Sequence, residues 1–186
     1  MSTPQETRRR TEVRRLVTGL RDDGTHGVVA DERVVARTAR AFAGLENALL
    51  YAADAVPPVP NDGVAPGGHP FFPAAGGVRV FVLTIEPAHA VADPGPITEA
   101  DLGEAEAVFP GLLAYHGGEN PAMHRTCTVD VGIVLEGSVE VELDDGETHV
   151  LAAGDTIVQN GTRHAWHNRG EGTARLAFVV LGATPA

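Results

Sequence analysis

Between residues 124 and 168, short runs of β-favouring residues alternate with tight turns, and this pattern constrains the fold more than any other feature. Residues 138–143 alternate strictly between apolar and polar side chains, which is typical of a half-buried antiparallel strand. Asp145-Gly146 follows as a strong hairpin signal, because glycine accepts positive φ. Residues 147–151 then return as the partner strand. The stretch predicts antiparallel β structure.

Similar runs flank this hairpin and extend the prediction to an all-β chain. Each is short, rich in branched or aromatic residues and bounded by glycine, proline or polar turns, and together they predict a sandwich or barrel. The predicted strands outside the hairpin cover residues 14–20, 27–30, 78–85, 156–159 and 175–181. Residues 34–53 suit either a helix or paired edge strands, and we favour strands. Residues 98–108 predict a short helix or loop, with Thr98 as a possible N-cap.

Strand parity places several polar side chains together. If residues 124–130 are extended, His124, Thr126, Thr128 and Asp130 share one face. Past the turn at Asn160-Gly161, His164, Trp166 and Asn168 also share one face, with His167 on the other. We expect His124, Asp130 and His164 to meet inside the barrel.

Two motifs in this region resemble those of the cupin superfamily. The first reads His124-Arg125-Thr126, three residues, Asp130, six residues and Gly137, where cupins have H-x-H, three or four residues, Glu, six residues and Gly. Thr126 therefore replaces a histidine, and Asp130 replaces the longer glutamate.

The second motif follows in the expected order. It reads Gly154, four residues, Gln159-Asn160-Gly161, two residues, His164, three residues and Asn168, whereas cupins have Gly, five residues, P-x-G, two residues, His, three residues and Asn. The chain is similar to a subgroup of small single-domain bacterial and fungal cupins. The resemblance implies a double-stranded β-helix, or jelly-roll barrel.

The resemblance also implies the domain organisation. We expect a flexible N-terminus over residues 1–12 and a single cupin domain over 13–186, with the barrel motifs within 110–186. The strands before residue 31 would form an N-terminal β extension. Residues 54–76 are rich in proline and glycine and predict a long loop, in which Phe71-Phe72 is either a lid over the barrel mouth or ordinary surface packing.

The candidate catalytic residues are His124, Asp130 and His164, which are also the candidate metal ligands. Two imidazoles and one carboxylate suit a divalent metal ion, such as Fe, Zn, Ni or Mn, with coordination positions left for substrate. Without a metal, a His–Asp pair in an apolar cavity is still a candidate general base.

Further residues are candidates for binding a substrate. These are Thr126, Thr128 and Trp166, although Trp166 suits the barrel core equally well. Near the mouth of the barrel, Tyr115, His116 and Glu119 precede the first motif.

Charge and composition exclude several classes of protein. A formal net charge of −11 argues against a nucleic-acid partner. All 14 basic residues are arginine, so no lysine can form a Schiff base. Cys127 is the single cysteine and faces away from His124 by parity. With no long apolar run and no signal-peptide pattern, we expect no membrane partner and a cytoplasmic location.

The leading functional hypothesis is a metal-assisted enzyme acting on a small carbonyl- or carboxylate-bearing molecule. Lyase, isomerase, decarboxylase or cyclase chemistry in specialised metabolism fits best. An Fe(II)-dependent dioxygenase and a non-catalytic small-ligand-binding cupin are the alternatives. An exposed sheet edge needs cover, so we also expect a homodimer.

Overall fold

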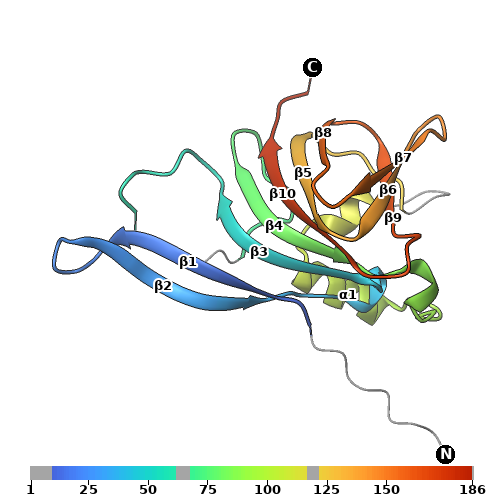
Figure 1. The fold of residues 1–186 in the computed structure, drawn as a ribbon, viewed down its shortest axis with the longest axis horizontal. Helices are drawn as coiled ribbons and strands as arrows, with labels where there is room; N and C mark the ends of the chain where they lie inside the picture. Colours follow the sequence, from blue (N-terminus) through green and yellow to red (C-terminus); the bar gives the residue numbers. More distant parts are fainter. Residues whose placement is uncertain (1–9, 62–67, 117–121, 186) are drawn as a thin grey trace, which may run out of the picture.

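The computed structural model describes residues 10–61, 68–116 and 122–185, and it is built on two antiparallel β-sheets (Figure 1). The larger sheet has five strands in the order β3-β4-β10-β5-β8, and the smaller has three in the order β7-β6-β9. The bounds are β3 (Leu45–Ala53), β4 (Val78–Ile85), β5 (Thr128–Glu136), β6 (Ser138–Leu143), β7 (Thr148–Ala152), β8 (Thr156–Asn160), β9 (His164–His167) and β10 (Ala174–Gly182). The non-sequential strand order is that of a jelly roll, which confirms the predicted fold class.

The main core lies between the two sheets. The smaller sheet contributes Val139 from β6 and the half-buried Trp166 from β9, which pack against the inner face of the larger sheet. The buried members of this core are Phe81, Ile85, Val134, Val139, Ala174, Leu176, Phe178 and Val180. Alternation along each strand directs these side chains inward, and burying them drives the two sheets together.

The predicted hairpin between β6 and β7 is present. Its turn places Gly146 at φ 80°, with the Gly146 amide donating to the Leu143 carbonyl at 3.0 Å. The parity predicted for residues 124–130 also appears, because Thr126, Thr128 and Asp130 are buried whereas Arg125 and Cys127 are exposed.

The N-terminal extension is a separate two-stranded sheet of β1 (Glu12–Leu20) and β2 (His26–Val35). It reaches away from the barrel beside β3 (Figure 1). The strands are longer than the sequence predicted. Residues 34–53, which suited helix or strand, comprise the end of β2, the 3-10 turn η1 (Arg40–Phe42) and β3. Of the segment 1–12 that was predicted to be flexible, residues 1–9 lie outside the described residues. Glu12 is not part of a flexible end, because it is the first residue of β1.

Besides η1, the described helical elements are α1 (Glu99–Val108), η2 (Ala88–Ala90) and η3 (Leu112–Tyr115). α1 and η3 pack together as a helical layer. Thr98 caps α1 through a reciprocal capping box with Asp101, which confirms the predicted short helix and its N-cap. A second apolar cluster joins this layer to η1 and to Phe71 and Phe72; its buried members are Ala39, Ala105, Phe109 and Leu112.

The proline-rich loop is tied to the barrel by Arg79, which is only 1% exposed. Its guanidinium donates to the carbonyl oxygens of Pro70, at 2.9 Å, and Ala53, at 3.1 Å, and pairs with the Asp54 carboxylate at 2.6 Å. Residues 62–67 of this loop lie outside the described residues. Of the helices in the described ranges, none is long and apolar enough to cross a membrane.

Candidate functional site

His124 and His164 are held side by side by their own backbones. Each backbone N–H donates to the carbonyl of the other residue, at 3.0 and 2.9 Å, which forms an isolated bridge between His124 and the start of β9. The two ring centroids lie 4.5 Å apart. The sequence predicted this convergence from parity and motif spacing.

The hydrogen bonds of the two rings determine their tautomers. Nδ1 of His124 lies 3.1 Å from the Ala122 carbonyl oxygen, and Nδ1 of His164 lies 2.9 Å from the Thr162 carbonyl oxygen. A carbonyl oxygen only accepts, so Nδ1 must carry the proton in both rings. In the neutral rings, both Nε2 atoms therefore hold a lone pair.

Both rings favour the neutral form. Burial lowers the pKa of His124 to about 4, and repulsion from His164 adds to the effect. Burial lowers the pKa of His164 as well, although its hydrogen bond to the Thr162 carbonyl opposes the shift. Two neutral imidazoles at neighbouring positions are available as bases.

Asp130 is positioned by β5 and is 6% exposed. Burial raises the pKa of its carboxyl group, partly offset by a hydrogen bond from the Thr128 hydroxyl. Because that hydroxyl has one proton, it must accept from Thr126 in their mutual 2.7 Å contact. Asp130 Oδ1 has no hydrogen-bond partner within the described part of the chain.

All three predicted catalytic residues line one cavity of about 630 Å³. Trp166 also lines it and packs edge-on against Phe178, with ring centroids 5.7 Å apart. The two predicted threonines, Thr126 and Thr128, are buried but are not among its lining residues. They connect to the site through Asp130.

Most of the cavity wall is apolar and comes from parts of the chain outside the two motifs. Aromatic side chains from η1, the proline-rich loop, the larger sheet and the turn after α1 contribute to it, namely Phe42, Phe71, Phe72, Phe81 and Phe109. Phe72 lies with its ring centroid 6.3 Å from that of His124. Phe71 and Phe72 therefore form part of the wall, and whether they move as a lid stays a prediction.

His116 also lines the cavity, with its ring centroid 4.9 Å from that of His124. Tyr115 contacts Phe72 edge-on, with centroids 4.9 Å apart, and is not among the lining residues. Glu119 lies outside the described residues. Cys127 is exposed, as parity predicted.

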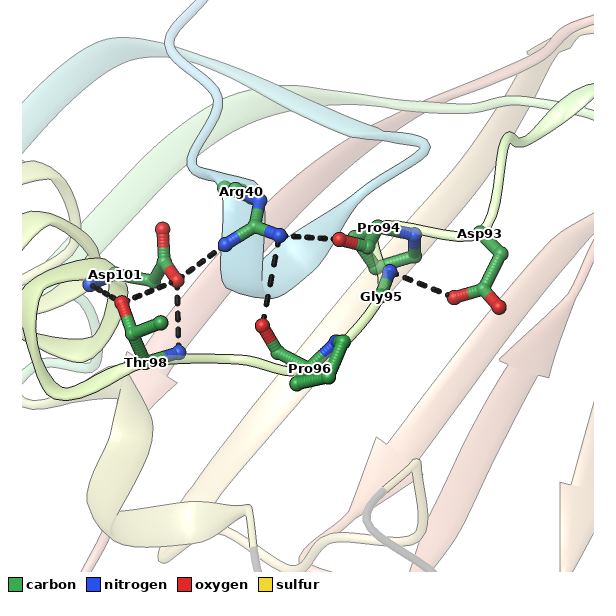
Figure 2. Close-up of polar contacts among 7 residues, drawn as sticks. All are labelled: Arg40, Asp93, Pro94, Gly95, Pro96, Thr98 and Asp101. Carbon is green, nitrogen blue, oxygen red and sulfur yellow. Dashed lines mark hydrogen bonds and ion pairs between the residues drawn. The ribbon is translucent and has the colours of Figure 1, made fainter.

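The segment before α1 forms another wall and is fixed by Arg40 (Figure 2). The guanidinium of Arg40 contacts the Pro94 and Pro96 carbonyl oxygens and pairs with Asp101, the same carboxylate that closes the Thr98 capping box. Val91, Pro94, Ile97 and Leu102 of this region line the cavity. Arg40 therefore holds this wall in place from η1.

Gln159 is a site residue that the motif comparison treated only as a departure from the cupin pattern. It lies on β8 directly opposite Asp130 in the β5–β8 register, is 4% exposed and lines the cavity. Neither Oε1 nor Nε2 of its carboxamide has a hydrogen-bond partner among the described residues. Strand parity, which puts Gln159 on the same face as Ile157, is the sequence signal that could have identified it.

His124, Asp130 and His164 meet only part of what a metal centre needs. Both histidines present an unprotonated Nε2 with Nδ1–H on a carbonyl, which is how metal-binding histidines are commonly oriented. However, residues 10–61, 68–116 and 122–185 contain no group of three or more His, Cys, Asp or Glu side chains arranged to hold a metal ion. The two imidazoles fit such a role, but Asp130 does not complete a three-ligand set with them.

Comparison with known proteins places these residues in a family. Residues 111–180 match the family model of the cupin domain (Cupin_2). Oryzines biosynthesis cluster protein J of Aspergillus oryzae is 44% identical over 72 residues, which cover 38% of this chain and 40% of that protein. Phomopsin biosynthesis cluster protein C' of Diaporthe leptostromiformis is 47% identical over 70 residues, 37% of this chain and 36% of that protein.

A third relative is named as an oxidoreductase and not as a biosynthesis cluster protein. The cupin-domain-containing oxidoreductase virC of Hypocrea virens is 42% identical over 66 residues, 34% of this chain and 34% of that protein. The chain thus matches about two fifths or less of the length of these curated relatives. Residues 111–180, which match the cupin domain model, include both paired histidines, Asp130 and Gln159.

Proposed function

We propose that this protein is a small-molecule enzyme of specialised metabolism that performs acid–base chemistry on an apolar, carbonyl-bearing substrate. One observation carries the proposal: two adjacent imidazoles that favour the neutral form lie in an otherwise mainly apolar cavity of about 630 Å³. Apolar cavities with a few convergent polar groups and perturbed titratable residues are typical of active sites. The names of two relatives as biosynthesis cluster proteins support the metabolic context.

The residues suit proton transfer next to a carbonyl group. Nε2 of His124 or His164 takes a proton from the carbon beside the carbonyl, and the carbonyl oxygen takes a proton from the Asp130 carboxyl to give an enol. Burial favours the protonated form of Asp130, as this role requires. In an isomerisation, the histidine returns its proton to another carbon of the enol system and the enol oxygen returns its proton to Asp130. In an elimination, a leaving group departs from the β-carbon with the proton held by the histidine, and the enol oxygen again returns its proton to Asp130.

The reaction can be tested without knowing the natural substrate. In deuterium oxide, the wild-type protein should accelerate exchange of the α-protons of 1-tetralone, an apolar ketone, as followed by proton NMR. Of His124→Gln and His164→Gln, the variant that removes the acting base should lower the enzyme-dependent rate by roughly 10²- to 10⁴-fold, and the double variant should do the same. His149→Gln is the matched control, because His149 is exposed and pairs with Glu147. Exchange at the buffer rate, or equal rates for all variants, would contradict the proposal.

Oxidation is the second candidate, and the oxidoreductase name of the third relative favours it. An Fe(II)-dependent dioxygenase would consume oxygen in proportion to substrate, whereas the acid–base reaction would not. Metal binding by His124, Asp130 and His164 stays a prediction. Elemental analysis of wild-type, His124→Ala and His164→Ala proteins, combined with an oxygen electrode, separates the two candidates.

A further inference from the structure

Gln159 and Asp130 are adjacent polar groups on the inner surface of the cavity. They are register partners on the antiparallel strands β5 and β8, so their side chains leave the sheet on the same face. Both side chains are more than nine-tenths buried and both line the cavity. A ligand in the cavity would therefore meet the two side chains together.

The two residues retain hydrogen-bonding capacity that the described protein does not use. Oε1 and Nε2 of Gln159 and Oδ1 of Asp130 are buried without a partner among the described residues. Buried polar groups normally pair, because leaving one unpaired is costly. A Gln carboxamide offers a donor and an acceptor side by side in one plane. Its natural complement is a ligand group that presents an acceptor and a donor with the same spacing.

The lack of cationic Lys or Arg side chains among the described residues of the cavity wall limits which ligand group can bind opposite Gln159. The chain has no lysine, and no arginine of the described ranges lines the cavity. A carboxylate would meet the Gln159 carbonyl oxygen and the Asp130 carboxyl without a compensating guanidinium. Burying such an anion is strongly unfavourable. A neutral group is therefore favoured over the carboxylate that the sequence left open.

We propose that Gln159 and Asp130 form a recognition pair for a neutral cis-amide or lactam of the substrate. The lactam N–H donates to Gln159 Oε1, its carbonyl oxygen accepts from Gln159 Nε2, and Asp130 Oδ1 provides a further polar contact. This inference rests on the proposed function, because it names the polar group of the substrate at the same site. The apolar remainder of the ligand lies against the aromatic wall.

Three bicyclic probes of similar shape test the pair by isothermal titration calorimetry. 2-Quinolone has the lactam N–H and carbonyl, coumarin replaces that N–H with oxygen, and naphthalene has neither group. Wild-type protein should bind 2-quinolone about tenfold more tightly than coumarin, because coumarin leaves Gln159 Oε1 unpaired. Gln159→Met, which keeps the side-chain length, should remove this preference. It should also weaken the binding of coumarin, whose carbonyl oxygen loses the Gln159 Nε2 donor, and leave the affinity for naphthalene within about twofold.

Stability provides a second readout. Because Gln159→Met removes unpaired buried polar atoms, the variant should unfold at or above the wild-type temperature, so that lost quinolone binding is not loss of the fold. Equal wild-type affinities for 2-quinolone and coumarin, or a preference that persists in Gln159→Met, would overturn the recognition pair. If coumarin and naphthalene still bound and ketone exchange continued, the proposed function would stand. Failure of all three probes to bind, with no exchange, would overturn both.

Discussion

His124 and His164 lie forty residues apart in the chain, yet each donates its backbone N–H to the carbonyl of the other, at 3.0 and 2.9 Å. This reciprocal bridge fixes the two rings with their centroids 4.5 Å apart. Each ring also donates Nδ1–H to a carbonyl two residues before it. Hydrogen bonds to the backbone thus orient both candidate bases.

The depressed pKa of His124 predicts a loss of stability in acid. The unfolded ring has a pKa of about 6.5, whereas the folded ring has a pKa of about 4. Between these values the unfolded chain binds more protons, so the free energy of unfolding falls as the pH is lowered through this range. Wild-type protein should lose roughly 2 kcal/mol more than His124→Gln, after allowance for the partial exposure of the ring.

Urea denaturation at a series of pH values measures this difference. Asp130 acts in the opposite direction, because its raised pKa contributes stability that is present in acid and lost as the pH rises through the folded value. Comparing wild type with His124→Gln cancels that contribution, since both proteins contain Asp130. Parallel stability curves for the two proteins would show that His124 does not fold as a neutral buried ring.

Gly132 lies directly against Phe178, whose ring forms part of the cavity wall. A Cβ atom at this position would lie 2.8 Å from Cε1 of Phe178 and 3.0 Å from Cγ2 of Ile157. Gly132→Ala should therefore lower the free energy of unfolding by about 1–3 kcal/mol through overpacking. Gly103→Ala is the matched control: a Cβ there has no neighbour within 4 Å, and Gly103 lies in the exposed part of α1. That variant should gain about 0.5–1 kcal/mol.

Thermal and urea denaturation of both glycine variants test this pair of predictions. The two substitutions change the same atoms and differ only in surroundings. A Gly132→Ala protein as stable as the Gly103→Ala protein would mean that Phe178 moves aside without cost.

The prediction from sequence was most complete where structure is local. Alternation gave the β6–β7 hairpin, and the residues around Thr98 gave the helix cap, because both depend on neighbours within a few positions. The spacing of the cupin motifs brought His124, Asp130 and His164 to one cavity. The Asp130 carboxyl group and the two imidazoles do not form a three-ligand cluster. Asp130 lies on β5, whereas His124 and His164 are joined by their own backbone bridge.

Most of the cavity wall could not be predicted from the sequence, which offered only Phe71-Phe72 and Trp166 as candidates. Phe42, Phe71 and Phe109 come from three segments that meet only after long-range packing. The role of Gln159 depends on its cross-strand register with Asp130, which the motif spacing did not specify. Homodimer formation and a cytoplasmic location stay predictions, and sedimentation velocity tests the first.

Arg79 should contribute far more to stability than an exposed arginine in an ion pair. It is 1% exposed and supplies donors to several carbonyl oxygens as well as to Asp54. Arg79→Met should lower the free energy of unfolding by about 3–5 kcal/mol, because these acceptors and the Asp54 charge lose their partner. Arg14→Met breaks the Arg14–Asp31 pair, whose side chains are 63% and 47% exposed, and should cost less than about 1 kcal/mol.

Urea denaturation at neutral pH compares the two arginine variants directly. Similar losses for both substitutions would show that Arg79 does not anchor the start of the proline-rich loop. Limited proteolysis adds a local readout, since only Arg79→Met should increase cleavage near Asp54.

The most direct test of the site is a nitrogen-15 NMR titration of the histidine rings, assigned with His124→Gln and His164→Gln. Both rings should be neutral at pH 7 with the proton on Nδ1, and His124 should titrate near pH 4. A His124 ring that titrates near its ordinary value of about 6.5, or a proton on Nε2 in either ring, would contradict a site built on two buried neutral imidazoles.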